Sequence, residues 1–301
     1  MPYWLTMAIR KEQLHGGRAL GRAPPISLRI VRFLFARVGA VFPALLGRWA
    51  YSLWFRTRRF PQSAAGRQVT LNAAHEIVQV GHVPVAVYSW GSGPVVLFVH
   101  GWSGRGSQVA AFIEPLLDAG FRVVAPDLPG HGTTPGHSTN ILECAEVLQA
   151  IQQRYGKAAA VLTHSFGGMV LAYAMNHGLH AQCAVCIAAP ADARFLIDGF
   201  AQTLDMHPSV VTNLCKRLEK RFEHDFWERI STECNVRKLS TPALVVHDLK
   251  DSSVPWQQGE RIASAWPGAQ FMKTQGLGHG RILQDAAVID VAVSFVTRTV
   301  G

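Results

Sequence analysis

The sequence predicts an α/β protein with a mostly parallel central sheet and helices on both of its faces. Two observations carry this prediction. From residue 75 onward, short apolar runs typical of strands alternate with helical stretches. Some of these runs, such as VVLFVHG at 95–101, are apolar almost throughout, as expected for strands buried on both faces of a parallel sheet. The 301 residues are enough for one large domain of this class with additions to it.

The strands and helices follow one another in a regular order. HEIVQV (75–80) and VPVAVYSW (83–90) are separated by a short turn and are predicted to pair as a hairpin before the strand at 95–101. The expected strands after that are 121–127, 158–165, 183–190, 243–248 and 270–276, and the expected helices are 106–118, 139–155, 167–177, 256–266 and 282–298. Such sheets bind ligands at the C-terminal ends of their parallel strands, so the residues just beyond those ends are the candidates for function.

Composition divides the chain into four parts. We expect a basic amphipathic N-terminal arm at 1–66, the first part of the α/β core at 67–190, a helical cap at 191–238 and the second part of the core at 239–301. The first 65 residues contain ten arginines and one lysine but a single acid, whereas the rest of the chain is nearly neutral. Because the body does not carry the basic charge, nucleic acid is not expected as a partner.

Three strand ends carry residues that together suit nucleophilic catalysis. Ser165 ends the fourth strand at a turn followed by glycines, Asp251 lies on the loop after the strand at 243–248, and His279 lies on a glycine-rich loop after the last strand. Serine is a weak nucleophile unless a base takes its proton, and an imidazole base needs a carboxylate to fix its tautomer. The sequence supplies all three groups.

Five short motifs follow the strand ends in order: HGWSG (100–104), APDLPGHG (125–132), THSFGG (163–168), DSSVP (251–255) and GLGHG (276–280). With these motifs the sequence resembles the α/β-hydrolase fold family over roughly residues 75–300. The resemblance implies that Ser165 is the nucleophile, Asp251 the acid and His279 the base, with an oxyanion hole made by the backbone N–H groups of Trp102 and Phe166. One departure is Thr163, which stands where the family usually has glycine.

Other polar residues near these positions compete for the same roles. Asp248 is an alternative acid, but the loop position of Asp251 and the Val-Pro that follows match the family better. His164 is expected to be a buried hydrogen-bonding residue rather than a second base, and His100 is expected to orient the oxyanion loop. The thirteen histidines show no metal-ligand spacing, so neither a metal nor another cofactor is expected.

The five cysteines are few, odd in number and widely spaced, apart from a CxxC formed by Cys183 and Cys186. This pair falls in an apolar run that reads as a buried strand, where residues i and i+3 point to opposite faces. Nothing demands disulfides, so a reducing, cytoplasmic compartment is the expected location.

The cap is expected to help form the substrate pocket. Its residues Phe195, Leu196 and Phe200 lie in an amphipathic helical pattern whose apolar face would pack on the sheet edge and roof an acyl pocket. A cap of under fifty residues favours a small or medium acyl group.

The arm mixes arginines with large apolar residues over 27–60. A spanning helix would have to include Arg48 in its middle, which costs about 2.5–3.5 kcal/mol on insertion scales. Two interpretations remain. The arm lies on an anionic membrane surface, on the cytoplasmic side, and inserts aromatic side chains, or it docks on its own body or on a second subunit. The residues expected to insert are Trp49, Trp54, Phe33 and Phe35.

The combined interpretation is a serine hydrolase that cleaves a carboxylic ester of a small molecule through an acyl–Ser165 intermediate. A thioesterase or an acyltransferase with the same triad is an alternative, because the sequence does not show which groups donate and accept the acyl group. A non-catalytic binding protein on this fold is disfavoured because no member of the triad is missing. A haloalkane dehalogenase is disfavoured because the nucleophile is serine rather than aspartate. The oligomeric state stays open.

Overall fold

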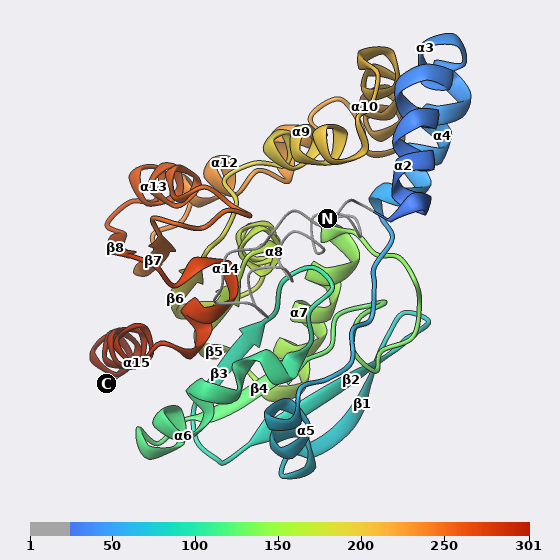
Figure 1. The fold of residues 1–301 in the computed structure, drawn as a ribbon. Helices are drawn as coiled ribbons and strands as arrows, with labels where there is room; N and C mark the ends of the chain where they lie inside the picture. The colour runs from blue at the N-terminus through green and yellow to red at the C-terminus, as the bar shows by residue number, and fades with distance from the viewer. Residues whose placement is uncertain (1–24) are drawn as a thin grey trace.

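The computed structural model describes residues 25–301, in which eight strands form one sheet flanked by helices (Figure 1). The strand order is β1-β2-β4-β3-β5-β6-β7-β8. β2 runs antiparallel to β1 and β4, and the pairs from β4 through β3 to β8 are parallel. The predicted hairpin and parallel sheet are therefore confirmed. The strands are β1 (Ala74–Val80), β2 (Val83–Trp90), β3 (Val95–Val99), β4 (Arg122–Pro126), β5 (Ala158–His164), β6 (Ala181–Ile187), β7 (Ala243–Asp248) and β8 (Gln270–Thr274).

Helices cover both faces of this sheet and bury two apolar layers. α6 and α15 pack on one face, whereas α7, α8 and α13 pack on the other. The bounds are α5 (Ala64–Leu71), α6 (Ala110–Asp118), α7 (Ile141–Tyr155), α8 (Phe166–Met175), α13 (Trp256–Ala265), α14 (Gly278–Arg281) and α15 (Ala286–Val300), with 3-10 turns at Gly106–Val109 and Ile282–Gln284.

Strand β6 shows how an apolar run serves both layers at once. Successive side chains of a strand point to opposite faces, and in β6 Cys183 belongs to one apolar layer while Cys186 belongs to the other. Both thiols are free, and burial raises the pKa of Cys183 to about 12 and that of Cys186 to about 11. Because the two side chains point apart, they do not form a redox or metal-binding CxxC pair.

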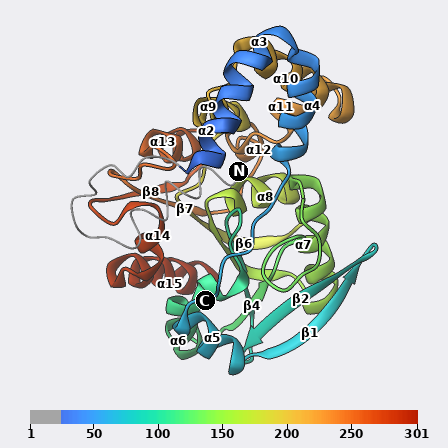
Figure 2. The same ribbon diagram turned by 45° about the vertical axis from the view of Figure 1, so that its right-hand side comes forward.

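Two groups of helices lie together beyond the sheet (Figure 1 and Figure 2). We call the first group the arm helices and the second the insertion helices. α4 of the arm helices packs along α10, and α2 lies against α9. The arm helices are α2 (Ile26–Phe33), the π-helix Leu34–Val38, α3 (Gly39–Val41) and α4 (Pro43–Trp54), and the insertion helices are α9 (Ala193–Leu204), α10 (Pro208–Phe222), α11 (Phe226–Arg229) and α12 (Thr232–Val236).

Two glycines allow the arm helices to approach α10 closely. A Cβ atom on Gly47 would lie 2.6 Å from the Asn213 Cβ, and one on Gly39 would lie 2.7 Å from a Val210 methyl. These separations are shorter than any two carbon side-chain atoms tolerate, so only glycine permits this contact. The inner face of the arm helices is thus fixed against the insertion.

Aromatic packing reinforces the contact. Phe35 is fully buried and stacks on Trp49 with ring centroids 4.9 Å apart, while Trp54 lies 5.5 Å from the ring of Phe200 in α9. The expectation that Phe35 and Trp54 insert into a membrane is wrong, because both are already buried inside the protein. The other interpretation, in which the arm docks on the body of its own chain, agrees with the packing of the inner face of the arm helices on the insertion helices.

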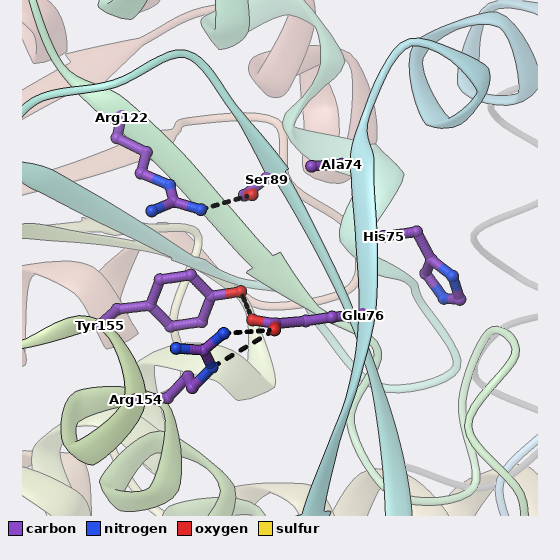
Figure 3. A pocket seen from close by; sticks show the side chains of 7 residues that line it. All are labelled: Ala74, His75, Glu76, Ser89, Arg122, Arg154 and Tyr155. Carbon is purple, nitrogen blue, oxygen red and sulfur yellow. Dashed lines mark hydrogen bonds and ion pairs between the residues drawn. The ribbon is translucent and has the colours of Figure 1, made fainter.

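A surface pocket of about 390 Å³ lies beside β1, near the start of β4 and the end of α7 (Figure 3). Within it the Glu76 carboxylate accepts hydrogen bonds from the Tyr155 hydroxyl and from Arg154, the latter at 3.0 Å. Arg122 begins β4 and Tyr155 ends α7, so the pocket sits where the parallel strands start. Ligand sites of such sheets lie at the opposite edge, where the strands end. The lining residues are Ala74, His75, Glu76, Ser89, Arg122, Arg154 and Tyr155.

Candidate active site

Ser165 occupies a strained turn between β5 and α8. Its backbone has φ 53° and ψ −121°, a region that residues with a side chain rarely adopt and that costs roughly 1–3 kcal/mol. The turn is held in part by the Ser165 N–H, which donates to the Ile187 carbonyl at 2.9 Å. Strain of this kind persists only where the surroundings impose it, and it is typical of functional positions.

Close packing around this turn explains the two glycines after the serine and the threonine before it. A Cβ atom on Gly167 would lie 2.3 Å from the Val99 carbonyl oxygen, so α8 can begin against β3 only with glycine there. A Cβ atom on Gly168 would lie 2.5 Å from the Ala189 Cβ and 3.6 Å from the Thr163 hydroxyl. The missing side chain at Gly168 therefore leaves room beside Thr163, the residue that departs from the family pattern.

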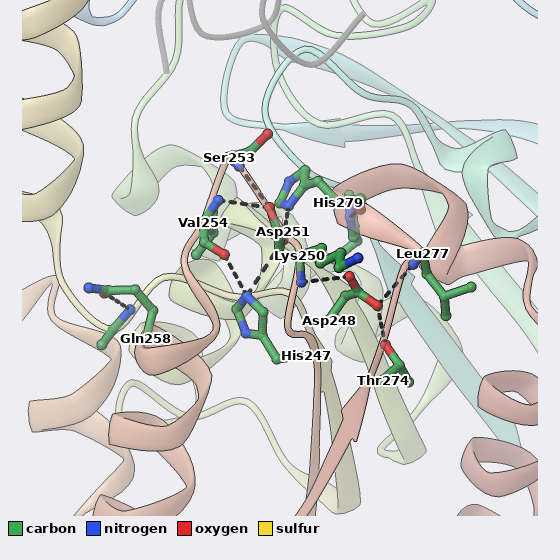
Figure 4. Close-up of polar contacts among 12 residues, drawn as sticks. His247, Asp248, Lys250, Asp251, Ser253, Val254, Gln258, Thr274, Leu277 and His279 are labelled. Carbon is green, nitrogen blue, oxygen red and sulfur yellow. Dashed lines mark hydrogen bonds and ion pairs between the residues drawn. The ribbon is translucent and has the colours of Figure 1, made fainter. Parts of the chain in front are cut away.

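Asp251 and His279 meet at the same edge of the sheet (Figure 4). The His279 Nδ1 lies 2.7 Å from Asp251 Oδ2, and both side chains are buried. A carboxylate only accepts hydrogen bonds, so this contact places the proton of neutral His279 on Nδ1 and leaves Nε2 with its lone pair. His279 is thereby prepared to act as a base through Nε2.

The Asp251 carboxylate is held as an anion by several donors. Its Oδ1 accepts from the N–H groups of Ser253 at 2.8 Å and Val254 at 2.9 Å, and His247 Nε2 lies 3.5 Å from Oδ2. Burial by itself would raise the pKa of Asp251, but the hydrogen bonds from His247 and His279, the charge of His279 and the Val254 N–H outweigh burial and lower it. The acid therefore stays ionised at neutral pH.

Asp248 has a different set of partners. It accepts from the Lys250 N–H at 2.9 Å, the Thr274 hydroxyl at 2.8 Å and the Leu277 N–H at 3.0 Å. Burial opposes ionisation here too, but these backbone donors lower the pKa of Asp248. Asp248 joins the ends of β7 and β8, and Asp251 is the carboxylate that reaches His279.

His164, directly before Ser165, connects the serine turn to the His279 turn. Its Nε2 donates to the His279 carbonyl at 2.8 Å, and the two rings lie 4.8 Å apart. Burial, followed by the nearby charge of His279, lowers the pKa of His164 to about 3. His164 is thus neutral at pH 7 and occupied as a donor, which describes a positioning residue.

Ser165 and His279 are brought near each other without a direct bond. Within residues 25–301, no hydrogen bond joins the Ser165 hydroxyl to the His279 ring. Such bonds are often long in ligand-free enzymes and tighten when substrate binds. The link through His164 nevertheless fixes the His279 backbone beside the residue that precedes the serine.

The two candidate oxyanion residues lie side by side. The rings of Trp102 and Phe166 make an edge-to-face contact with centroids 4.9 Å apart. Phe166 is the first residue of α8, so its N–H has no partner within the helix. His100 fixes the loop that carries Trp102, because its ring bonds the Gly101 carbonyl at 2.7 Å and accepts from the Leu128 N–H at 3.0 Å.

The segment after the arm helices is built into the same region, which sequence reasoning missed. The Arg58 N–H donates to the Ser103 hydroxyl at 3.1 Å, directly beside Trp102. Ser103 itself has a positive φ of 57°. Two further backbone bonds join this segment to the loop after β4, from Thr57 to the His137 carbonyl at 3.0 Å and from Thr139 to the Phe55 carbonyl at 3.1 Å. The segment 55–58 therefore braces both the loop that carries Trp102 and the loop after β4.

His247 was also missed. It precedes Asp251 by four positions inside the apolar run of β7, and its fully buried ring donates from Nε2 to the Val254 carbonyl at 2.8 Å. A histidine that directly follows the apolar residues 243–246 in a buried strand was the available signal. It supports the turn that presents Asp251.

The three cap residues expected at an acyl pocket divide into two kinds. Phe195 is half-buried and Leu196 is buried at the start of α9, close to where the chain leaves the end of β6. Phe200 is buried against Trp54 of the arm helices. Its ring is used in the contact between α9 and α4.

Comparison with known proteins agrees with the fold. The model of the alpha/beta hydrolase family matches residues 96–291. Among solved structures, a putative lipase from Acinetobacter baumannii has a TM-score of 0.61 and 14% identity, covering 80% of this chain and 98% of that one. An esterase from Exiguobacterium antarcticum has a TM-score of 0.56 and 18% identity, covering 73% and 98%.

Curated relatives match over shorter stretches. The lysophosphatidylserine lipase of Danio rerio is 27% identical over 57% of this chain and 47% of its own length. The pimeloyl-[acyl-carrier protein] methyl ester esterase of Aromatoleum aromaticum is 38% identical over 26% of this chain and 29% of its own. The human serine hydrolase-like protein is 35% identical over 30% and 46%. The chain thus matches less than half the length of each of these relatives.

Proposed function

Because this chain belongs to the α/β-hydrolase family, we propose that it is a serine hydrolase that cleaves carboxylic esters through an acyl–Ser165 intermediate. The observation that carries the proposal is the 2.7 Å contact between Asp251 and His279 at the sheet edge where Ser165 sits on its strained turn. The esterases and lipases among the relatives support an ester substrate.

In the proposed first half-reaction, the Ser165 hydroxyl oxygen attacks the ester carbonyl carbon while His279 Nε2 takes the hydroxyl proton. The carbonyl oxygen becomes an oxyanion, which the N–H groups of Trp102 and Phe166 would stabilise. Collapse of the tetrahedral intermediate breaks the bond to the alcohol, and His279 returns the proton to the departing oxygen. Asp251 keeps the imidazole in the required tautomer and stabilises its positive form throughout.

In the second half-reaction, water replaces the alcohol. His279 takes a proton from the water as its oxygen attacks the acyl–Ser165 carbonyl, and the carboxylic acid leaves when the proton returns to the serine oxygen. We also propose that the insertion helices act as the cap, with Phe195 and Leu196 beside the acyl group. Phe200 would then support the cap from behind.

The proposal is tested by labelling and by a substrate panel. A fluorophosphonate probe should label the wild-type protein once and should not label a Ser165→Ala variant. p-Nitrophenyl esters and acyl-thioesters of increasing chain length should then be compared by kcat/KM. Preference for esters supports the proposal, equal or faster thioester cleavage would reassign the enzyme as a thioesterase, and absence of labelling would reject Ser165 as a nucleophile.

A further inference from the structure

Exposed large apolar side chains concentrate on the arm helices, on what we call their outer face. Ten large apolar side chains are exposed in residues 25–301, and six of them fall within residues 26–45. These six are between 55% and 74% exposed. Scattered single apolar residues are ordinary on a surface, but a cluster this dense marks a site of interaction. The six are Ile26, Ile30, Phe33, Val41, Phe42 and Leu45.

Their direction is set by the packing on the other side. Ile26, Ile30 and Phe33 recur at i, i+4 and i+7, which places them on one face of α2. Leu28 and Phe35 are buried, and both belong to the apolar cluster that also contains side chains of the insertion helices. Because the close approach to α10 locks the inner face, the six exposed side chains cannot turn inward to hide from water.

The segment that carries this face has charge of a single sign. Residues 25–60 contain seven arginines and no acidic residue. Arg29, Arg37 and Arg48 are exposed, and no carboxylate of residues 25–301 forms an ion pair with them. Each lies three or four positions from Phe33 or Leu45, so each flanks an exposed apolar side chain.

We propose that the outer face of the arm helices docks peripherally on an anionic lipid surface. The six apolar side chains enter the boundary between headgroups and acyl chains, and the flanking arginines bind lipid phosphates. This goes beyond the proposed function, since it does not depend on the reaction at Ser165. Of the four side chains predicted to insert, Phe33 belongs to this exposed face, whereas Phe35 and Trp54 are buried and Trp49 is half-buried.

Docking on a lipid surface suits this face better than two alternatives, which are a helix that spans the membrane and contact with a second copy of the chain. Within residues 25–301 no helix is long and apolar enough to cross a membrane, and the 12 residues of α4 would extend only about 18 Å against a hydrocarbon core of about 30 Å. A second copy bound through a two-fold axis would bring this basic rim against itself, which is unfavourable. An anionic bilayer offers both an apolar layer and the opposite charge.

The test is co-sedimentation with vesicles of phosphatidylcholine containing phosphatidylglycerol, and with vesicles of phosphatidylcholine alone, over a salt series. Wild-type protein should bind the anionic vesicles at low salt, and binding should weaken at high salt. The variant Arg29→Gln/Arg37→Gln/Arg48→Gln should lose roughly a hundredfold in partitioning, since each basic residue contributes roughly fivefold. Its control Lys157→Gln/Lys238→Gln/Arg298→Gln removes the same charge elsewhere and should lose far less.

A second set of variants separates insertion from charge alone. Ile30→Ser/Phe33→Ser/Phe42→Ser should lose about tenfold or more in partitioning and bind weakly even at low salt. Leu71→Ser/Ile77→Ser removes exposed apolar side chains elsewhere and should bind like wild type. Thermal unfolding monitors folding of each variant.

Three results would overturn the proposal. The first is wild-type protein that stays in the supernatant with anionic vesicles at low salt. The second is a serine triple variant that binds as tightly as wild type. The third, seen by sedimentation equilibrium without lipid, is a dimer that Ile30→Ser/Phe33→Ser/Phe42→Ser converts to monomer, since the face would then be a subunit interface.

Discussion

The candidate active site and the outer face of the arm helices differ in how far the chain satisfies their side chains. Where the parallel strands end, the Asp251 carboxylate is buried and both of its oxygens accept hydrogen bonds. The donors to this carboxylate come from the segment 247–254 and from His279, which lies on a different loop. On the outer face of the arm helices, Ile26 and Val41 are 74% and 70% exposed to solvent. Within residues 25–301, the exposed apolar side chains on the outer face of the arm helices are left uncovered. Buried ionisable side chains whose hydrogen bonds are all made within the protein suggest a catalytic site. An exposed apolar face suggests a surface that binds a partner outside the chain.

The largest expected effect is the loss of ester hydrolysis when the Ser165 hydroxyl is removed. Replacing Ser165 with alanine should lower kcat for a p-nitrophenyl ester by about 10⁴–10⁶ without unfolding the protein, because only the nucleophilic oxygen is removed. The rate and the thermal unfolding curve measure this. Ser294→Ala, the same change at an exposed serine of α15, is the control and should leave both unchanged. A Ser165→Ala variant with the turnover of wild type would show that Ser165 is not the nucleophile and that this region is not the catalytic site described.

The next prediction distinguishes the two acids at the C-terminal edge of the sheet. Asp251→Asn should lower kcat by about 10⁴, because an amide favours the wrong imidazole tautomer and cannot stabilise the charged ring. Asp248→Asn should cost far less turnover, since the Asp248 oxygens hold the loops after β7 and β8 and do not contact His279. Kinetics of both variants on one ester give the answer. Reversed magnitudes would assign the acid to Asp248.

A third prediction compares the two faces of the arm helices. Trp54→Ala should lower the free energy of unfolding by about 3–5 kcal/mol, because it empties a buried site against Phe200. Leu45→Ala, on the outer face, should change it by no more than about 0.5 kcal/mol. Urea denaturation measures both. Equal effects would mean that the arm helices do not pack on the insertion as described.

The smallest expected effect is a pH dependence at Asp251. Its pKa in the folded protein lies below the ordinary value of 3.8, so its ionised form contributes stability above that value, and the contribution is lost as the pH falls through the lower folded pKa. The difference in unfolding free energy between wild type and Asp251→Asn should therefore be larger at about pH 6 than at about pH 3. Urea titrations at the two values measure it. A difference that grows toward acid would contradict the hydrogen bonds assigned to this carboxylate.

The residues that support the candidate site could not be predicted from the sequence, because their roles arise from packing between distant segments. His247 and Ser103 support Asp251 and Trp102 through contacts that could not be identified from spacing alone. His247 stands in a run read only as a buried strand, and Ser103 is tied to Arg58 across 45 positions. Such supporting contacts form between loops whose relative positions are known only once the sheet is assembled.

The order of strands and helices followed from the amino-acid sequence alone, because the periods of the two structures are local properties of the chain. With the rule that parallel strands end at one edge, the sequence also predicted that Ser165, Asp251 and His279 would gather there. Which side of the arm helices is buried, in contrast, became clear only from their packing against distant parts of the chain. Apolar residues occupy several sides of those helices, and the choice depends on contacts as distant as Arg32 with Thr203, 171 positions apart.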